Sequence, residues 1–255
     1  MPEESNPLQQ AAALICAATR ITVLTGAGIS AESGVPTFRD AQTGLWATYD
    51  PLQLATPEAF AADPERVWQW YAWRRELIAA AQPNPGHTAL AAMEQHCSNF
   101  HLITQNVDGL HQGAGSHNII ELHGNIHRTR CADKAHPAVP NPDDTRIPPR
   151  CPQCDAPLRP DVVWFGEHLP AAALERAFDA AKRCDLFLCI GTSSLVYPAA
   201  GLPYAALEAG AMLIEINPSE TPLSHNAHLH LRGPAGEILP RLIAAPRPTS
   251  EASRN

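Results

Sequence analysis

Short apolar runs recur along this chain and alternate with helical patterns, which limits the folds available to it. Six runs have the length of a strand, and several of them are continuous in apolar residues, as strands covered on both faces tend to be. These runs are 21–25, 101–104, 119–122, 186–190, 212–216 and 228–231. Helical patterns accompany them at 7–19, 86–96, 171–183 and 198–209. Alternating strands and helices predict an α/β fold with an open parallel sheet.

The composition excludes several classes of protein. With 255 residues, 45% of them hydrophobic and 17% charged, the chain can bury one large core or one core plus a small insert. The net charge is −8, whereas proteins that bind nucleic acids usually carry an excess of basic residues. No apolar run approaches the ~20 residues of a membrane helix, and the acidic N-terminus is unlike a signal peptide. We therefore predict a cytoplasmic protein with neither a membrane nor a nucleic acid as partner.

Proline is concentrated in one stretch of the chain. Of 25 prolines, eight lie between residues 135 and 160, together with Cys151 and Cys154. Because proline breaks helices, this stretch reads as an irregular insert fixed by turns or by a metal. The polar tail at 246–255 is predicted to be disordered.

Small and amide-bearing residues follow four of the predicted strands. Gly26-Ala27-Gly28 comes after the first strand, Gln105-Asn106 after the second, Gly191-Thr192 after 186–190, and Asn217 after 212–216. Ligands of open α/β sheets bind at the carboxyl ends of strands, so these residues predict one converging polar site. The Gly-Ala-Gly turn alone suits either a phosphate or an ordinary tight turn, because the third glycine of a dinucleotide fingerprint is missing.

Six motifs in order give a family resemblance. They are GAGISAESGVPTFR (26–39), TQNVDGLH (104–111), ELHGN (121–125), VVWFGE (162–167), GTS (191–193) and EIN (215–217). Together they resemble the sirtuins, NAD-dependent protein deacylases, over roughly residues 10–240. The resemblance implies a Rossmann-type, doubly wound NAD-binding domain at 1–39, 85–125 and 162–245. It also implies a small domain built from two insertions, a helical one at 40–84 and an irregular, zinc-ribbon-like one at 126–161.

The resemblance also implies which residues bind NAD. The expected cofactor-binding residues are Gly26, Ala27, Gly28, Phe38, Arg39, Gln105, Asn106, Asp108, Gly191, Thr192, Ser193, Asn217 and Ala235. The first five would line the diphosphate and the nicotinamide ribose, the next three the nicotinamide pocket and ribose, and the last five the adenosine half. Four residues separate Arg39 from Gly44 where relatives often have three. The cofactor loop is therefore expected to close somewhat differently.

Among the 12 histidines, His123 in ELHGN coincides with the general base of the family. An imidazole titrates near ~6.5, so it can accept a proton at neutral pH. In the family mechanism, the acyl oxygen attacks the nicotinamide ribose, nicotinamide leaves, and the base activates a ribose hydroxyl toward the resulting imidate. His123 would have this role, giving free lysine and O-acyl-ADP-ribose.

A helix expected from Asp63 to Ala81 bears on the acyl group. Its apolar stripe is Val67, Trp70, Tyr71, Leu77 and Ile78, with Arg74 in the middle. Residues three apart share a face, so Tyr71 and Arg74 could offer a phenol and a guanidinium to one carboxylate. Equally, Arg74 could extend to the surface beside a packed tyrosine.

The resemblance favours the first reading, because a Tyr-x-x-Arg pair marks the class III sirtuins, which remove succinyl, malonyl and glutaryl groups. It further implies that Val163 and Phe165 flank the substrate lysine. We accordingly expect desuccinylase and demalonylase activity, with deacetylation as well.

Cysteines of the irregular insert raise the question of a metal. Family members commonly hold zinc through two C-x-x-C pairs; here Cys151 and Cys154 form one, but Lys134 replaces the second thiol of the pair that Cys131 begins. His136 could substitute as fourth ligand, or the module holds together without metal. The remaining cysteines, Cys16, Cys97, Cys184 and Cys189, are expected to be buried core thiols.

Three rival functions remain to be weighed. A protein ADP-ribosyltransferase would use the same NAD pocket and transfer ADP-ribose to its target. A non-catalytic NAD or acyl-lysine reader would have no use for a base such as His123. An oxidoreductase is disfavoured, since no acid–base relay beside a hydride acceptor is visible.

Overall fold

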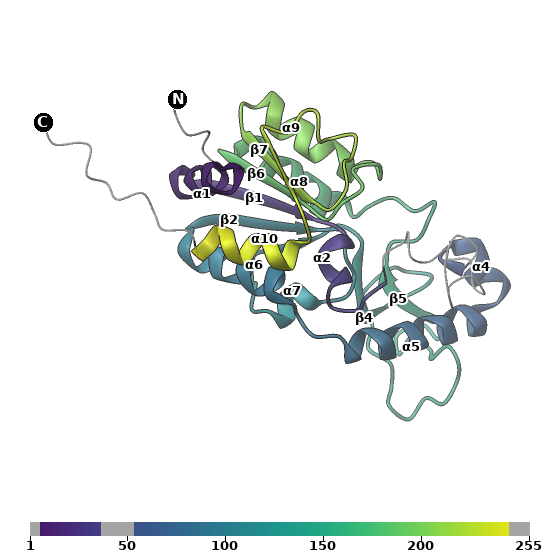
Figure 1. Cartoon of the computed structure of the whole chain (residues 1–255). Coiled ribbons are helices and arrows are strands. Elements are labelled where there is room, and N and C mark those ends of the chain that lie inside the picture. Colours follow the sequence, from purple (N-terminus) through teal and green to yellow (C-terminus); the bar gives the residue numbers. More distant parts are fainter. Residues whose placement is uncertain (1–5, 37–53, 245–255) are drawn as a thin grey trace, which may run out of the picture.

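The computed structural model describes residues 6–36 and 54–244, and all that follows concerns these residues. Phe38, Arg39, the loop at 40–46 and the tail at 246–255 lie outside them. A parallel six-stranded sheet forms the larger part of the molecule, in the order β3-β2-β1-β6-β7-β8 (Figure 1). Its strands are β1 (Arg20–Thr25), β2 (Asn99–Thr104), β3 (Ile119–Glu121), β6 (Leu186–Ile190), β7 (Met212–Asn217) and β8 (Leu229–Arg232).

This strand order confirms the predicted Rossmann-type, doubly wound sheet. The chain runs outward from β1 to β3 and then crosses back to place β6 on the other side of β1. Register aligns Thr25 with Thr104 on one side and with Ile190 on the other. The carboxyl ends of these strands therefore meet at one edge, beside the point where the strand order reverses, which is where such sheets bind ligands.

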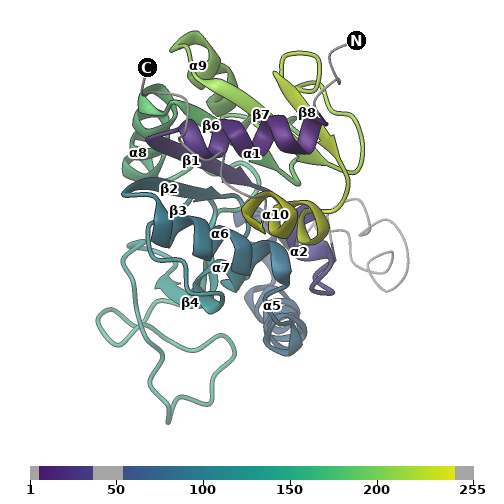
Figure 2. The same cartoon turned by 60° about the vertical axis from the view of Figure 1, so that its left-hand side comes forward.

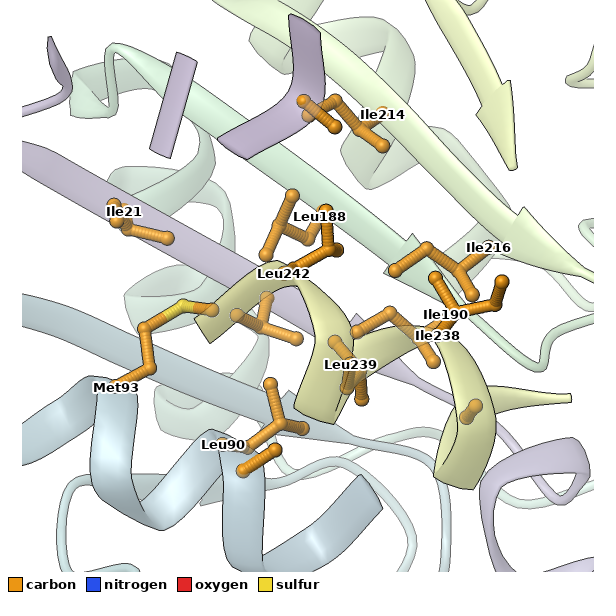
Figure 3. Packing of buried hydrophobic residues seen from close by; sticks show 14 of the residues in the cluster. Ile21, Leu90, Met93, Leu188, Ile190, Ile214, Ile216, Ile238, Leu239 and Leu242 are labelled. Carbon is orange, nitrogen blue, oxygen red and sulfur yellow. The ribbon is translucent and has the colours of Figure 1, made fainter. Parts of the chain in front are cut away.

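Helices cover both faces of the sheet. One face packs against α1 (Pro7–Ala17), α6 (Pro85–His96) and α10 (Ala235–Ala244), and the other against α8 (Ala171–Arg183) and α9 (Leu202–Glu208). Figure 3 shows the first of these contacts, where Leu90 and Met93 of α6 and Leu239 and Leu242 of α10 meet the sheet. Figure 2 shows α1, α6 and α10 together on that face.

Several helix starts follow directly from local sequence. Asn6, Thr56, Asp63 and Asn84 each accept a backbone N–H with the side chain, and a proline follows each of them at the start of the helix. These caps begin α1, α4 (Pro57–Ala62), α5 (Pro64–Ala80) and α6. Between 198 and 209 the prediction was only partly correct. Here Ala199–Gly201 form a 3-10 turn, and α9 begins at Leu202, beside Pro203.

A second, two-stranded sheet lies apart from the first. It pairs β4 (Gly124–Cys131) antiparallel with β5 (Leu158–Val162), and α5 packs against it. In Figure 1 this sheet, α4 and α5 lie together at one end of the molecule, on the side where β1 leads into α2 (Gly28–Ala31). The two sheets agree with the expected large and small domains, although the domain boundaries themselves stay predictions.

Three expectations about burial were wrong. Leu77 is 43% exposed, because it lies at the edge of a stripe whose centre is Val67, Tyr71 and Ile78. Cys16 is exposed on the outer side of α1, and Cys97 is only half-buried where α6 ends, whereas the other two core thiols are buried as expected.

No helix within the described ranges combines the length and the apolarity that a membrane crossing demands. A cytoplasmic location stays a prediction.

Candidate active site

The turns that follow β1 and β6 interlock through their backbones. The N–H of Gly28 donates to the carbonyl of Gly191 at 2.8 Å, and Gly191 adopts a φ of +60°. A Cβ on Gly28 would lie 2.7 Å from the Gly191 Cα, and one on Gly26 would lie 2.8 Å from the Gly191 oxygen. Only glycine fits these positions, so the paired turns keep a cradle of bare backbone at the strand ends.

The expected adenosine-binding residues gather beside this cradle. Asn217, at the end of β7, donates its side-chain N–H to the Thr192 carbonyl at 2.7 Å. Ala235 begins α10 and is buried. The next residue, Gly236, donates its N–H to the Glu32 carboxylate at 2.7 Å, which ties the start of α10 to the segment after α2.

Asn106, which is partly buried, and Asp108, which is buried, belong to one polar network. The Asn106 amide donates to the Gly26 carbonyl and to the Ser30 hydroxyl, both at 3.1 Å. The Ser30 hydroxyl in turn donates to Asp108 at 2.8 Å, and the same carboxylate accepts the Leu110 N–H. The network fixes the loop after β2 against the first turn.

Two buried histidines extend the network, and the sequence analysis did not single them out. His87 Nε2 lies 3.4 Å from the Ser30 hydroxyl, and His111 Nε2 lies 2.9 Å from the Thr25 hydroxyl. Burial lowers the pKa of His87 to about 4 and that of His111 to about 3. Both are therefore neutral at neutral pH. Ser30 carried one signal, its place two residues after the Gly-Ala-Gly turn; the histidines carried none that spacing could reveal.

His123 stands where the large sheet passes into the small one, between β3 and β4. Its Nδ1 lies 2.9 Å from the carbonyl of Gln105, and because a carbonyl only accepts, Nδ1 carries the proton. Nε2 is thereby left with its lone pair. Burial lowers the pKa of His123, and the bond to Gln105 acts in the opposite direction. The geometry is that of a neutral imidazole prepared to accept a proton.

Glycine again shapes the backbone beside His123. Gly124 has a φ of +78°, and a Cβ there would lie 2.1 Å from the Asp161 oxygen. Two residues further along the same segment, the N–H of Val163 donates to the His123 carbonyl at 2.9 Å. The expected substrate segment 163–165 is therefore anchored directly to His123.

Tyr71 and Arg74 lie together on α5, as their spacing predicted. Tyr71 is buried, and Arg74 is partly buried with its guanidinium carbon 5.4 Å from the centre of the Tyr71 ring and 4.9 Å from that of Trp70. Trp164 Nε1 donates to the Tyr71 hydroxyl at 2.9 Å. Burial raises the pKa of Tyr71, so the phenol keeps its proton at neutral pH.

The segment 163–167 is held by a buried ion pair that the sequence analysis did not identify. Arg159 is 4% exposed and pairs with Glu167 at 2.6 Å. Glu167 also accepts the backbone N–H of Trp164 at 2.9 Å. Phe165 is 43% exposed, and its N–H donates to the Ala55 carbonyl. Val163 and Phe165 thus lie on a segment fixed to both His123 and the small sheet.

The three predicted metal-ligating cysteines converge, and His136 joins them. The sulfur atoms of Cys131, Cys151 and Cys154 and a ring nitrogen of His136 all lie within 4.8 Å of one another. Cys131 and Cys154 are 3.5 Å apart at sulfur, and His136 Nε2 is 3.7 Å from the Cys151 sulfur. Zinc–sulfur bonds of about 2.3 Å in a tetrahedron place neighbouring sulfurs about 3.8 Å apart, so the donor set fits zinc.

Comparison with known proteins supports the reading of these motifs. A model of the Sir2 family matches residues 26–198. NAD-dependent protein deacylase 1 of Pseudomonas aeruginosa is 52% identical over 238 residues, which cover 90% of this chain and 95% of that protein. An NAD-dependent protein deacylase of Thermus thermophilus is 50% identical over 249 residues, covering 96% and 97%.

Solved structures agree with the sequence comparison. A Sir2 homologue in complex with NAD superposes with a TM-score of 0.85 and 47% identity, over 92% of each chain. A Sir2 bound to a p53 peptide and NAD+ gives a TM-score of 0.78 and 32% identity, over 90% of this chain and 94% of that one. The prediction is thus confirmed, and the chain belongs to the Sir2 family, the NAD-dependent sirtuins that its motifs resemble.

Proposed function

We propose that this chain removes acyl groups from lysine side chains of proteins, using NAD and yielding nicotinamide, O-acyl-ADP-ribose and free lysine. Relatives at 50% identity or more are named NAD-dependent protein deacylases, and a related Sir2 has been solved with a peptide. The observation that carries the proposal is His123, whose Nδ1 is committed to the Gln105 carbonyl.

Different residues of this chain bind NAD and accept the proton. NAD, when bound, supplies a ribose carbon with a readily broken bond to nicotinamide. The bare backbone at Gly26, Gly28 and Gly191 fits its diphosphate, because the glycines let the two turns pack directly against each other and leave backbone at the strand ends for a phosphate to approach. His123 Nε2 accepts the proton of a ribose hydroxyl, while the Nδ1 proton stays with Gln105.

We also propose which acyl groups this chain prefers. We assign the acyl pocket to Tyr71 and Arg74, with a preference for succinyl and malonyl groups. A guanidinium and a protonated phenol lie together on one face of α5, and a carboxylate at the end of the acyl chain is an acceptor to which both can donate. The aromatic rings of Trp70 and Trp164 keep this place apolar, which strengthens a charged hydrogen bond.

We further propose that the chain binds a structural zinc ion. We assign it to Cys131, Cys151, Cys154 and His136, in place of the four cysteines common in the family. His136 Nδ1 lies 2.9 Å from the Pro137 carbonyl, so Nδ1 carries the proton and Nε2 offers its lone pair to the three sulfurs. Lys134 is exposed. Zinc would fix the insert between β4 and β5 and takes no part in the chemistry.

One experiment tests the function directly. The full chain is incubated with NAD and with one peptide sequence carrying acetyl-, malonyl- or succinyl-lysine, and both products are followed by mass spectrometry. We expect free lysine and O-acyl-ADP-ribose, with the acidic acyl groups removed more efficiently. A peptide that instead gains the mass of ADP-ribose would establish the transferase alternative, and loss of acetyl alone would remove the acidic-acyl proposal.

A further inference from the structure

Trp164 connects the segment that flanks the substrate lysine with the helix that bears Tyr71. It lies two residues beyond β5, is 3% exposed, and packs between Phe60 and Tyr71, with ring centres 5.3 and 6.4 Å away. Its indole Nε1 donates to the Tyr71 hydroxyl at 2.9 Å. This hydrogen bond joins residues 93 positions apart in the chain.

The orientation of the indole is fixed from its other side. The guanidinium carbon of Arg159 lies 3.3 Å from the centre of the Trp164 ring. Arg159 also donates to both oxygens of Glu167 and to the Val162 carbonyl, and Glu167 accepts the Trp164 backbone N–H. A stacked cation and a bonded backbone hold one rotamer of the tryptophan.

The position of Trp164 determines in which direction the Tyr71 hydroxyl can donate its single proton. A phenol oxygen can accept and has one proton to donate. Trp164 already donates to this oxygen, and neither its indole N–H nor the neighbouring Arg74 guanidinium can accept. The phenol proton is thereby turned away from both, toward an acceptor that a substrate brings.

We propose that Trp164 is a positioning residue for acyl selection: its indole N–H directs the Tyr71 proton to the carboxylate at the end of the acyl chain. The inference rests on the proposed preference for acidic acyl groups. It makes the substrate segment and the acyl pocket one hydrogen-bonded unit, running from the Arg159–Glu167 pair through Trp164 to Tyr71.

The test is Trp164→Phe, which keeps an aromatic ring and removes the N–H. The measured quantity is kcat/KM on the succinyl peptide divided by kcat/KM on the acetyl peptide of the same sequence. We expect this ratio to fall by about two- to tenfold, as for loss of one neutral hydrogen bond, and chiefly through KM for the succinyl peptide. A merely structural defect lowers both activities and leaves the ratio unchanged. Trp68→Phe is the matched control, a partly buried tryptophan of α5 beside Arg75.

A double-mutant cycle with Tyr71→Phe separates the possible outcomes. In that background the hydroxyl is gone, so Trp164→Phe should change the ratio no further. An unchanged ratio in the single variant, or an equal fall in both backgrounds, would overturn the role of Trp164 while leaving the acidic-acyl proposal intact. A wild type without succinyl preference would instead remove that proposal itself.

A second measurement does not depend on the folding of Trp164→Phe. Tyr71→Phe removes only the acceptor, so the assigned indole N–H resonance of Trp164, one of five tryptophans, should lose its hydrogen-bonded shift in the NMR spectrum. The same resonance should move when succinyl-lysine peptide is added to the wild type and stay in place with acetyl-lysine peptide. A resonance indifferent to all three changes would overturn the inference.

Discussion

The NAD-facing edge of the large sheet and the acyl pocket beside the small sheet are built from different materials. At the first, Gly26, Gly28 and Gly191 bring backbone against backbone, with no room for a Cβ. At the second, the selectivity that we propose rests on three side chains, Tyr71, Arg74 and Trp164, which contact one another through a hydrogen bond and ring contacts. The two regions meet at His123, between β3 and β4.

This difference predicts how substitutions in each region alter the activity of the enzyme. A site made of interlocked backbone suits a ligand part that never varies, and a side-chain change there disturbs the turns themselves. A pocket made of side chains can alter its preference one residue at a time without moving the sheet. Substitutions in the first region should therefore affect every acyl substrate equally, and substitutions in the second should affect the substrates differently.

The largest loss of activity is expected at His123, where the two regions meet. His123→Ala should lower kcat by about 10²- to 10⁴-fold on every acyl peptide, the usual range for a general base. NAD binding, measured by calorimetry, should survive, because the base acts after the cofactor is seated. His117→Ala, an exposed histidine, serves as the control. Near wild-type turnover would exclude His123 as the base.

The next effect concerns the cluster of Cys131, His136, Cys151 and Cys154, the proposed zinc site. His136→Ala should weaken zinc by about 10²- to 10³-fold, since one of four ligands carries roughly a quarter of ~10–16 kcal/mol of binding free energy. Zinc content by metal analysis and a competing chelator give the affinity. Lys134→Ala should bind zinc as the wild type does. Equal affinity in all three proteins would remove His136 from the ligand set, and absence of zinc from a folded wild type would show that the module needs none.

A smaller, selective effect is expected in the acyl pocket. Arg74→Met keeps the helix and much of the side-chain volume but removes the charge. Loss of a charged hydrogen bond, roughly 1.5–3 kcal/mol, should lower kcat/KM on succinyl and malonyl peptides by about ten- to a hundredfold relative to acetyl. Arg66→Met, an exposed arginine of the same helix, should change neither. Parallel losses on acetyl and succinyl peptides would mean that Arg74 supports the fold and that ordinary deacetylation is the better assignment.

The sequence predicted the backbone-built region better than the side-chain network. Continuous apolar runs gave the strands of the large sheet, and strand ends located the glycine turns, because both depend on residues adjacent in sequence. The link from Arg159 and Glu167 through Trp164 to Tyr71 joins β5, the following segment and α5, and no local spacing encodes it. The same holds for the buried His87 and His111, which only the folded chain brings next to Ser30 and Thr25.

His136 shows an intermediate case. A fourth ligand was needed near Cys131, and both Lys134 and His136 lay within reach along the chain. The sequence could not decide how the turn after β4 projects each side chain. In the structure the His136 carbonyl accepts the Cys131 N–H, which folds the chain back and brings the imidazole to the thiols.

The last and smallest effect tests the backbone-built region itself. In Gly28→Ala the new Cβ would lie 2.7 Å from the Gly191 Cα, and because both neighbours are backbone, the two turns must separate. Overpacking of this kind costs typically ~1–3 kcal/mol, so KM for NAD should rise by about ten-fold, and by the same factor with acetyl, malonyl and succinyl peptides.

Gly201→Ala is the matched control, since its Cβ would meet only the Phe178 ring at 3.6 Å, an ordinary contact. Calorimetric NAD titrations and the three peptides measure both quantities. A Gly28→Ala enzyme whose KM for NAD is unchanged, or whose loss depends on the acyl group, would break the division between a backbone-built cofactor edge and a side-chain-built acyl pocket.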